Sequence, residues 1–231
     1  FEKVYDFAIG GSAVSNRVDT TSPFYWFDGE NLITALTTGV TTNQDANISG
    51  LSIAAQRHWT AMKAMDFSDL DLIVFAWGTN DYWQGKTIAE INSAYNSIFA
   101  MIRSTYPTVR MLVLSPIWRL IDYDSTTQQY VDSDTVTKGS AGVTLRQIAN
   151  GIIENCKQER ISVYDSYSNV QVCLANVPTF FDNVTVEGDE DEQSGIEVPH
   201  GSGQYYSGVH LNEAGNKMYS QIVHGAIMGI F

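Results

Sequence analysis

The stretch Asp71-Leu-Ile-Val-Phe-Ala-Trp77, followed at once by Gly78-Thr-Asn-Asp81, decides the fold. The first seven residues are nearly all apolar and rich in strand formers, and the run stops at a glycine. A strand that is apolar along its whole length is typical of a parallel sheet with helices on both faces. We therefore expect 71–77 to be a buried parallel strand with the polar residues 78–81 at its carboxyl end.

Three other short apolar runs have the same character and predict further strands, at 4–9, 110–115 and 161–165. Apolar residues also recur at steps of three and four, which predicts helices over 53–65, over 88–102, after Gly142 and over 212–228, with one more around 31–36. Alternating strands and helices predict an α/β fold, a three-layer α/β/α sandwich around a central parallel sheet. In such sheets ligands bind at the carboxyl ends of the strands.

The composition limits the class of protein. With 231 residues, of which 44% are hydrophobic and 12% aromatic, the chain is expected to form one domain, residues 1–231. Its net charge of −13 disfavours nucleic acid and anionic membranes as partners. No apolar run approaches the roughly 18 residues needed to span a bilayer. Cys156 and Cys173 are too few for a disulfide framework or a four-cysteine zinc site.

Residues 174–209 are expected to form a long loop-like excursion, with five acids at 187–192. That cluster lacks the spaced oxygen ligands and central glycine of a calcium loop, so we expect a solvated acidic segment and no metal. The low lysine content and the acidic, Ser/Thr-rich surface favour a secreted or cell-surface location. A first residue that is not Met suggests that an upstream segment was removed.

Two polar motifs follow predicted strands or precede predicted helices. In Gly78-Thr-Asn-Asp81, a side-chain amide at the end of a strand can direct an N–H at a developing oxyanion, although the same residues are common in turns. In Ser207-Gly-Val-His-Leu-Asn212, Asn212 is expected to be the N-cap of the last helix. This places His210 on a loop tip before a helix, a position suited to a general base.

The two motifs resemble the third and last sequence blocks of the SGNH (GDSL-type) hydrolases, which are esterases. The resemblance implies a flavodoxin-like sandwich, with Asn80 as an oxyanion donor, His210 as the general base, and no metal or cofactor. The segment Pro116-Ile-Trp-Arg119 also looks like members of that family that act on sugar esters.

The first two blocks of that family allow two interpretations. In the first, Ser12 at the tip of strand 4–9 is the nucleophile and Gly50 is the oxyanion glycine. In the second, 4–11 is the second block, Gly11 is the oxyanion glycine, and the nucleophile lies upstream of Phe1. Both keep Asn80 and His210 in the same roles.

Ser207 stands where the family carries the aspartate that orients the histidine. The resemblance thus implies a serine ester hydrolase that removes acetyl or other short acyl groups from a carbohydrate, with Tyr82, Trp83 and Tyr206 either contacting the sugar or packing in the core. The alternative is a non-catalytic or weakly active carbohydrate-binding module on a decayed esterase scaffold.

Overall fold

Three of the four predicted strands form a parallel sheet. The structure, a computed structural model, describes residues 4–5, 7–124, 129–140, 142–170, 172–173, 177–184, 197–199 and 205–230. Within these ranges the parallel sheet contains β1 (Leu72–Phe75), β2 (Arg110–Leu114) and β5 (Ser162–Tyr164), in the order β1-β2-β5. Val113 in the middle strand pairs with Phe75 on one side and Val163 on the other. The apolar run at 71–77 is therefore confirmed as a sheet strand.

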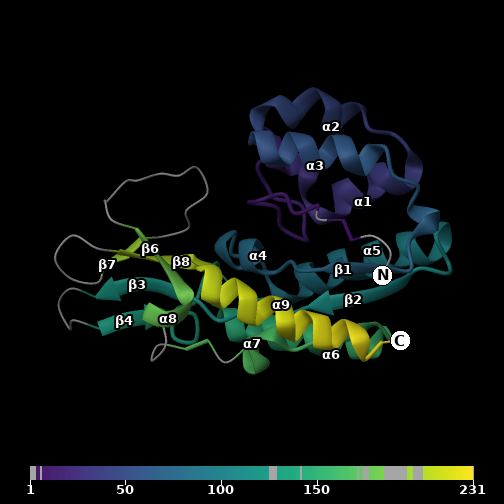
Figure 1. The fold of residues 1–231 in the computed structure, drawn as a ribbon. Coiled ribbons are helices and arrows are strands. Elements are labelled where there is room, and N and C mark those ends of the chain that lie inside the picture. Colours follow the sequence, from purple (N-terminus) through teal and green to yellow (C-terminus); the bar gives the residue numbers. More distant parts are fainter. Residues whose placement is uncertain are drawn as a thin grey trace.

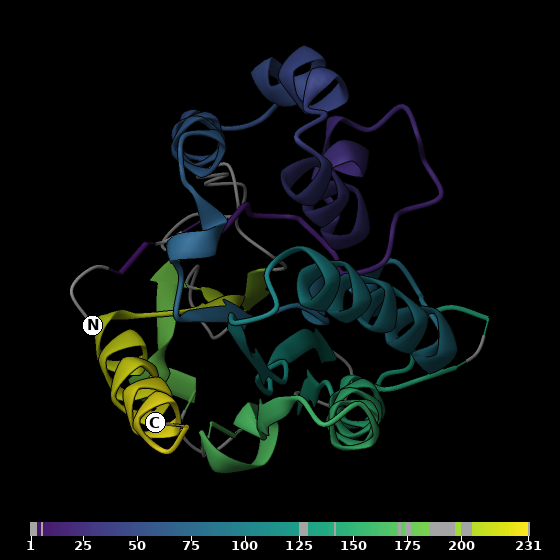
Figure 2. The same ribbon diagram turned by 90° about the vertical axis from the view of Figure 1, so that its right-hand side faces the viewer.

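Helices lie on both sides of this sheet (Figures 1 and 2). The helices that follow the strands are α4 (Thr79–Trp83), α5 (Ile88–Thr105), α6 (Leu145–Gln158), α7 (Ser166–Asn169) and α9 (Glu213–Met228). Capping boxes begin the two long internal helices, because Thr87 pairs with Glu90 and Thr144 with Gln147. Their apolar faces meet in one buried core with β1 and β2. The fold is thus mixed α/β with a parallel sheet, as predicted.

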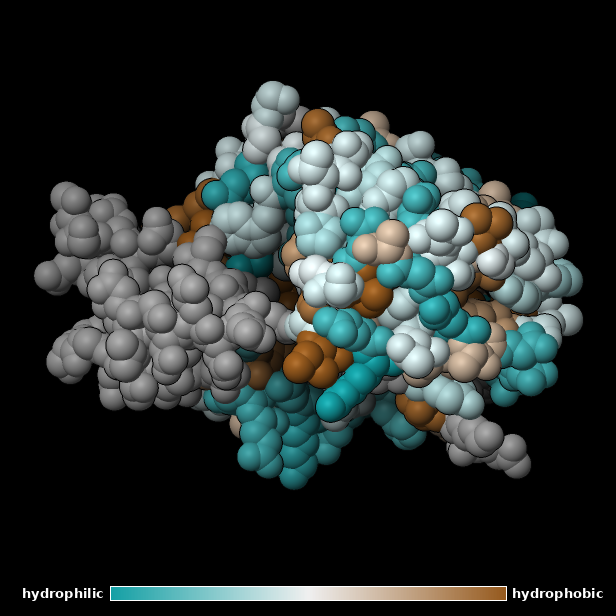
Figure 3. All heavy atoms as spheres, turned by 90° about the horizontal axis from the view of Figure 1, so that it is seen from above, coloured by the Kyte–Doolittle hydropathy of each residue, from teal (hydrophilic) through white to brown (hydrophobic). Residues whose placement is uncertain are grey.

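The N-terminal third forms a helical layer with a core of its own, which lies above the sheet in Figure 1. Its elements are η1 (Pro23–Phe27), α1 (Gly29–Thr38), α2 (Thr42–Asn47), η2 (Ile48–Gly50), α3 (Ile53–Lys63) and η3 (Phe67–Asp69). Trp59 is buried against Phe27 and donates its indole N–H to Asp45. On the outer face of the layer, apolar side chains lie scattered among polar ones (Figure 3).

The strand expected at 4–9 is wrong for the residues that the structure describes there, since none of them belongs to a strand. The carbonyl of Ile9 instead accepts from the N–H of Ser12, and the carbonyl of Ala8 lies 2.6 Å from Nδ1 of His58. Because these backbone groups bond to a turn and a helix, the segment crosses the helical layer and does not join the sheet. Within the described ranges β1 pairs with β2 alone.

Parts of the excursion at 174–209 form helix and strand where a loop was predicted. It contains α8 (Val177–Phe180), β6 (Phe181–Val184), β7 (Glu197–Pro199) and the start of β8 (Tyr205–Leu211). These strands form an antiparallel sheet in the order β6-β8-β7, and β3 (Leu120–Asp124) and β4 (Gln129–Asp132) form a separate antiparallel pair. The acids at 187–192 lie outside the described residues. None of the described helices is long and apolar enough to cross a membrane.

Two glycines of α9 offer a matched test of this packing. A Cβ at Gly215 would lie 2.4 Å from the carbonyl oxygen of Phe180, whereas a Cβ at Gly225 would meet nothing within 4 Å. We expect Gly215→Ala to lower the free energy of unfolding by about 1–3 kcal/mol through overpacking. Gly225→Ala should raise it by up to about 1 kcal/mol through helix propensity. Denaturant unfolding of both variants checks this, and equal effects would contradict the close approach of α9 to α8.

Candidate functional site

The Gly78–Asp81 motif lies at the carboxyl end of β1, as the sequence predicted. Gly78 has a φ of +124°, and a Cβ there would lie 2.9 Å from Ile152 and from Pro116. A side chain at this position is therefore excluded on both conformational and steric grounds. The turn at Gly78 leads directly into α4, whose first turn carries Asn80 and Asp81.

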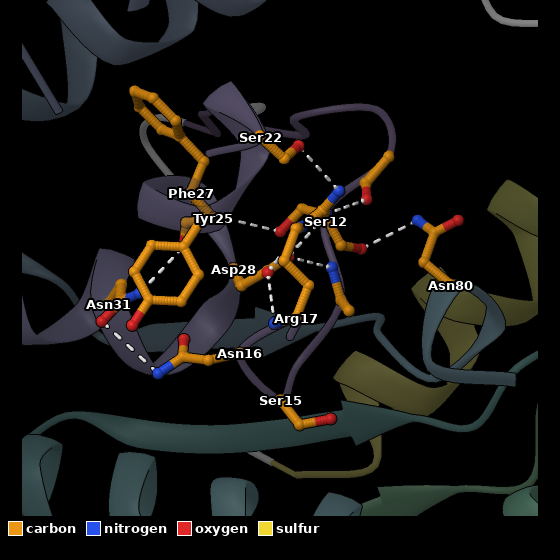
Figure 4. Close-up of polar contacts among 12 residues, drawn as sticks. Ser12, Ser15, Asn16, Arg17, Ser22, Tyr25, Phe27, Asp28, Asn31 and Asn80 are labelled. Atoms are coloured by element: carbon orange, nitrogen blue, oxygen red, sulfur yellow. Dashed lines mark hydrogen bonds and ion pairs between the residues drawn. The ribbon is translucent and has the colours of Figure 1, made fainter. Parts of the chain in front are cut away.

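Both of these side chains hold the loop that contains Ser12. The Nδ2 group of Asn80 donates to the carbonyl oxygen of Ser12 at 2.8 Å (Figure 4). The buried carboxylate of Asp81 accepts from the backbone N–H of Val14 at 2.9 Å, the N–H of Ser15 at 3.0 Å and the hydroxyl of Ser15 at 2.5 Å. Burial raises the pKa of Asp81. The 12–15 loop is thus fixed to the end of β1 by contacts across more than sixty-five residues of sequence.

A second acid fixes the same loop from the other side. Asp28 is fully buried and accepts from the N–H of Ala13 at 3.0 Å. It also forms an ion pair with Arg17, whose Nε and terminal nitrogen reach its two oxygens at 2.9 and 2.8 Å (Figure 4). Lys86 adds a bond of 2.6 Å to the carbonyl of Asn16. The loop is therefore rigid on both flanks.

Ser12 itself is held in the interior. Its side chain is only 5% exposed, and its hydroxyl donates to the carbonyl of Phe27 at 2.6 Å (Figure 4). In this arrangement the oxygen of Ser12 faces the helical layer. A nucleophilic role would require this bond to break.

The two candidate oxyanion glycines have different surroundings. Gly11 precedes Ser12, has a φ of +83°, and leaves no room for a Cβ, which would lie 3.0 Å from the ring of Phe24. Asn80 bonds to the carbonyl of Ser12, the residue that follows Gly11 in the chain. Gly50 ends η2 and packs against Pro23 of η1. Of the two glycines, Gly11 is therefore the one whose neighbour in the chain contacts Asn80.

His210 is the second-last residue of β8 and is exposed. The expectation of a loop tip is corrected, because the strand continues to Leu211, which pairs with Phe181 of β6. The predicted N-cap is confirmed, since Oδ1 of Asn212 accepts from the N–H of Gly215 at 2.9 Å. The Nδ2 group of Asn212 donates to the carbonyls of Thr179 and Phe181. His210 thus lies at the end of a paired strand, just before a capped helix.

A continuous set of contacts links Asn80 to the strand of His210. Trp83, one helical turn after Asn80, lies under the guanidinium of Arg119, 4.7 Å from its ring centroid. The neighbouring Trp118 meets the ring of Phe181 edge-on, with centroids 6.2 Å apart. Phe181 pairs with Leu211, which follows His210 in β8. These contacts pass from the end of β1 to the segment after β2 and on to β8.

The three aromatic residues predicted to contact a sugar have different outcomes. Tyr82 is fully buried and donates its hydroxyl to the carbonyl of Val136 at 3.0 Å, so it is a core residue. Trp83 is half-buried, with cations near its ring. Tyr206 lies in β8, and its side chain lies outside the described residues, as does that of Ser207.

Sequence reasoning missed two charged residues of this region. It treated Asp81 as part of a turn motif and Arg119 as part of a resemblance, whereas both are buried in the structure. The signal for Arg119 was a charge inside the apolar run Ile117-Trp-Arg-Leu-Ile121. Among the described residues, no three His, Cys, Asp or Glu side chains cluster closely enough to hold a metal ion.

No protein-family model matches this chain, and neither does any curated protein. One solved crystal structure aligns with 95% of this chain and 76% of its own, at 13% identity and a TM-score of 0.52. A possible lipase from Chitinophaga pinensis DSM 2588 aligns over 70% of this chain and 72% of its own, at 19% identity and a TM-score of 0.45. A protein from Lactobacillus plantarum aligns over 74% and 72%, at 17% identity and a TM-score of 0.49. At 13% identity, the similarity to the first of these structures concerns the fold alone.

The variant Asp81→Asn tests whether the hydrogen bonds of Asp81 hold the 12–15 loop in place. The new amide would direct an N–H group at a backbone N–H donor, so we expect the free energy of unfolding to fall by about 1–3 kcal/mol. We also expect the amides of Val14 and Ser15 to exchange their hydrogens at least about tenfold faster, since 1.4 kcal/mol corresponds to a factor of ten.

Asp19→Asn is the control, because Asp19 is an exposed acid in the following segment. Its effect on stability should stay within about 0.5 kcal/mol. Unchanged exchange at Val14 and Ser15 in Asp81→Asn would show that the carboxylate does not hold the loop.

Proposed function

We propose that this chain carries the oxyanion donors and the general base of a serine ester hydrolase. The observation that supports this most directly is the position of the Asn80 amide, which lies after the end of β1 and bonds to the carbonyl of Ser12, the residue that follows Gly11. An amide nitrogen has two N–H groups, so one can hold the Ser12 carbonyl while the other points at a substrate oxygen. Fixed donors of this kind stabilise the oxyanion of acyl transfer. The backbone N–H of Gly11 is the second donor in this proposal.

His210 is the proposed general base. It takes the proton of a serine hydroxyl as that oxygen attacks the ester carbonyl, and the carbonyl electrons move onto the oxygen that Asn80 and Gly11 stabilise. When the tetrahedral intermediate collapses, the imidazolium returns the proton to the leaving alcohol. A water molecule, deprotonated by the same imidazole, then releases the acid and restores the serine. Contacts through Trp83, Arg119, Trp118 and Phe181 connect the helix of Asn80 to the strand that holds His210.

The surroundings of Ser12 favour the second interpretation of the sequence, in which Gly11 is the oxyanion glycine and Ser12 is not the nucleophile. The hydroxyl of Ser12 is bonded to Phe27 and faces away from solvent.

The proposed substrate is a carbohydrate that carries acetyl or another short acyl group. Trp83 is a half-buried indole one helical turn from Asn80, and because Arg119 and Lys138 lie over its ring, a sugar would contact the part of the ring that these cations leave exposed. The acid that would orient His210 is missing at its usual position, since Ser207 stands where the SGNH hydrolases carry aspartate. A serine hydroxyl can hold the imidazole tautomer but adds no charge to stabilise the imidazolium, so a low turnover number is expected.

Hydrolysis of p-nitrophenyl acetate by the natural protein tests the two central residues. We expect Asn80→Ala to lower kcat by about 10²–10³ through loss of an oxyanion donor. His210→Ala should lower it by about 10³ or more, because the proton of the nucleophile then has no acceptor. His224→Ala is the matched control, an exposed histidine on α9 whose loss should leave the rate unchanged. Equal rates for His210→Ala and the parent would favour the non-catalytic carbohydrate-binding module.

A fluorophosphonate that labels activated serines tests the nucleophile. Because the Ser12 hydroxyl is buried and already bonded, we expect no adduct at Ser12, and we expect Ser12→Ala to keep the parent's esterase rate within about threefold, or less than 1 kcal/mol of barrier. Peptide mapping by mass spectrometry locates any adduct. An adduct on Ser12, lost in Ser12→Ala together with the activity, would instead establish the first interpretation.

A further inference from the structure

Arg119 is a buried cation with two unsatisfied nitrogens. Only 1% of the residue is exposed, in the segment between β2 and β3. Its backbone N–H donates to the hydroxyl of Ser133 at 3.2 Å, and its Nε donates to the carbonyl of Leu120 at 3.4 Å. Its two terminal nitrogens are buried and have no hydrogen-bond partner. Within the described part of the chain, the two outer nitrogens of the guanidinium therefore have no hydrogen-bond acceptor.

A desolvated guanidinium without an anion is strongly unfavourable, because burial removes hydration that nothing replaces. Burial lowers the pKa of Arg119 to about 9. The chain has 26 acidic residues, yet none of those that the structure describes forms an ion pair with Arg119. Asp134, on the neighbouring segment, is instead bonded to Arg146 and to the hydroxyl of Tyr167. Among the described residues, Arg119 therefore has no counter-charge.

Two cations share the ring of Trp83 beside Arg119's unpaired nitrogens. Its guanidinium carbon lies 4.7 Å from the ring centroid of Trp83, and Nζ of Lys138 lies 4.5 Å from the same centroid. Trp83 and Lys138 are half-buried, whereas the two terminal nitrogens of Arg119 are buried. Trp83 follows Asn80 by one turn of α4, so Arg119 packs against the same short helix that carries the Asn80 amide.

We propose that the two terminal nitrogens of Arg119 bind a carboxylate of the substrate, with Lys138 closing the site over Trp83. Two parallel N–H groups match the two oxygens of a carboxylate. Together with the proposed esterase function, on which this part rests, the inference identifies the substrate as an ester that also carries a free carboxylate. The overall charge of −13 repels such molecules at long range, so Arg119 would supply selectivity at the site itself.

Thermal unfolding with monomethyl succinate tests this without requiring turnover. We expect this half-ester to raise the Tm of the natural protein by about 3 °C or more at tenfold its Kd. Dimethyl succinate, which lacks the charge, should have no comparable effect. Arg119→Met should abolish the shift, and its Tm without ligand should equal or exceed the parent's, because an unpaired buried charge has been replaced by an apolar chain of similar length.

Arg146→Met is the matched control, since Arg146 is a more exposed arginine that is already paired with Asp134. It should keep the full carboxylate-dependent shift. Arg119→Lys, which keeps the charge but loses the fork, should bind the half-ester at least tenfold more weakly, and it decides the question if Arg119→Met does not fold. Equal shifts with the two succinate esters, or undiminished binding in Arg119→Lys, would overturn the proposal. A shift that depends on Arg119 in a protein without esterase activity would refute only the hydrolase function.

Discussion

The carboxylate of Asp81 joins the 12–15 loop to the start of α4, at the carboxyl end of β1. It accepts three hydrogen bonds from Val14 and Ser15 and is itself fixed at the start of α4, directly after β1. A buried carboxylate is unfavourable unless such donors surround it, so the loop and the helix start stabilise each other. Because the 12–15 loop is held in place, its bond to the Asn80 amide fixes the direction of that amide. The position of the candidate oxyanion donor therefore depends on this pair of contacts.

Packed side chains also connect α4 to β8, the strand that holds His210. Trp83 supports Arg119, Trp118 packs on Phe181, and Phe181 pairs with the end of the strand that holds His210. Asn212 then closes the junction by capping α9 while it bonds back to the 179–181 segment. The charge on Arg119 is the exception among these apolar side chains. Because no described acid pairs with it, this cation could bind the charge of a ligand, and it packs against the helix that carries Asn80.

The sequence predicts the part of the fold that follows from local pattern. The apolar runs at 71–77, 110–115 and 161–165 are strands, and the periodic segments are helices, because each buries a face that its own spacing defines. The run at 4–9 has the same composition but no neighbouring strand among the described residues, and pattern alone cannot supply one. The strands within 174–209 were missed because antiparallel pairing there joins Phe181 to Leu211 across thirty residues of polar sequence. Motif spelling placed Asn80 correctly at the end of its strand, but the burial of Ser12 and Arg119 depends on contacts between distant segments.

The central claim is that the Asn80 amide and the His210 imidazole face one pocket. A crystal structure of the natural protein after treatment with a fluorophosphonate measures this most directly. The account predicts a phosphonyl oxygen within about 3.2 Å of both Nδ2 of Asn80 and the N–H of Gly11, with a ring nitrogen of His210 near the phosphonylated serine oxygen. An adduct bound away from Asn80, or an imidazole on the opposite side of the molecule from that amide, would contradict it.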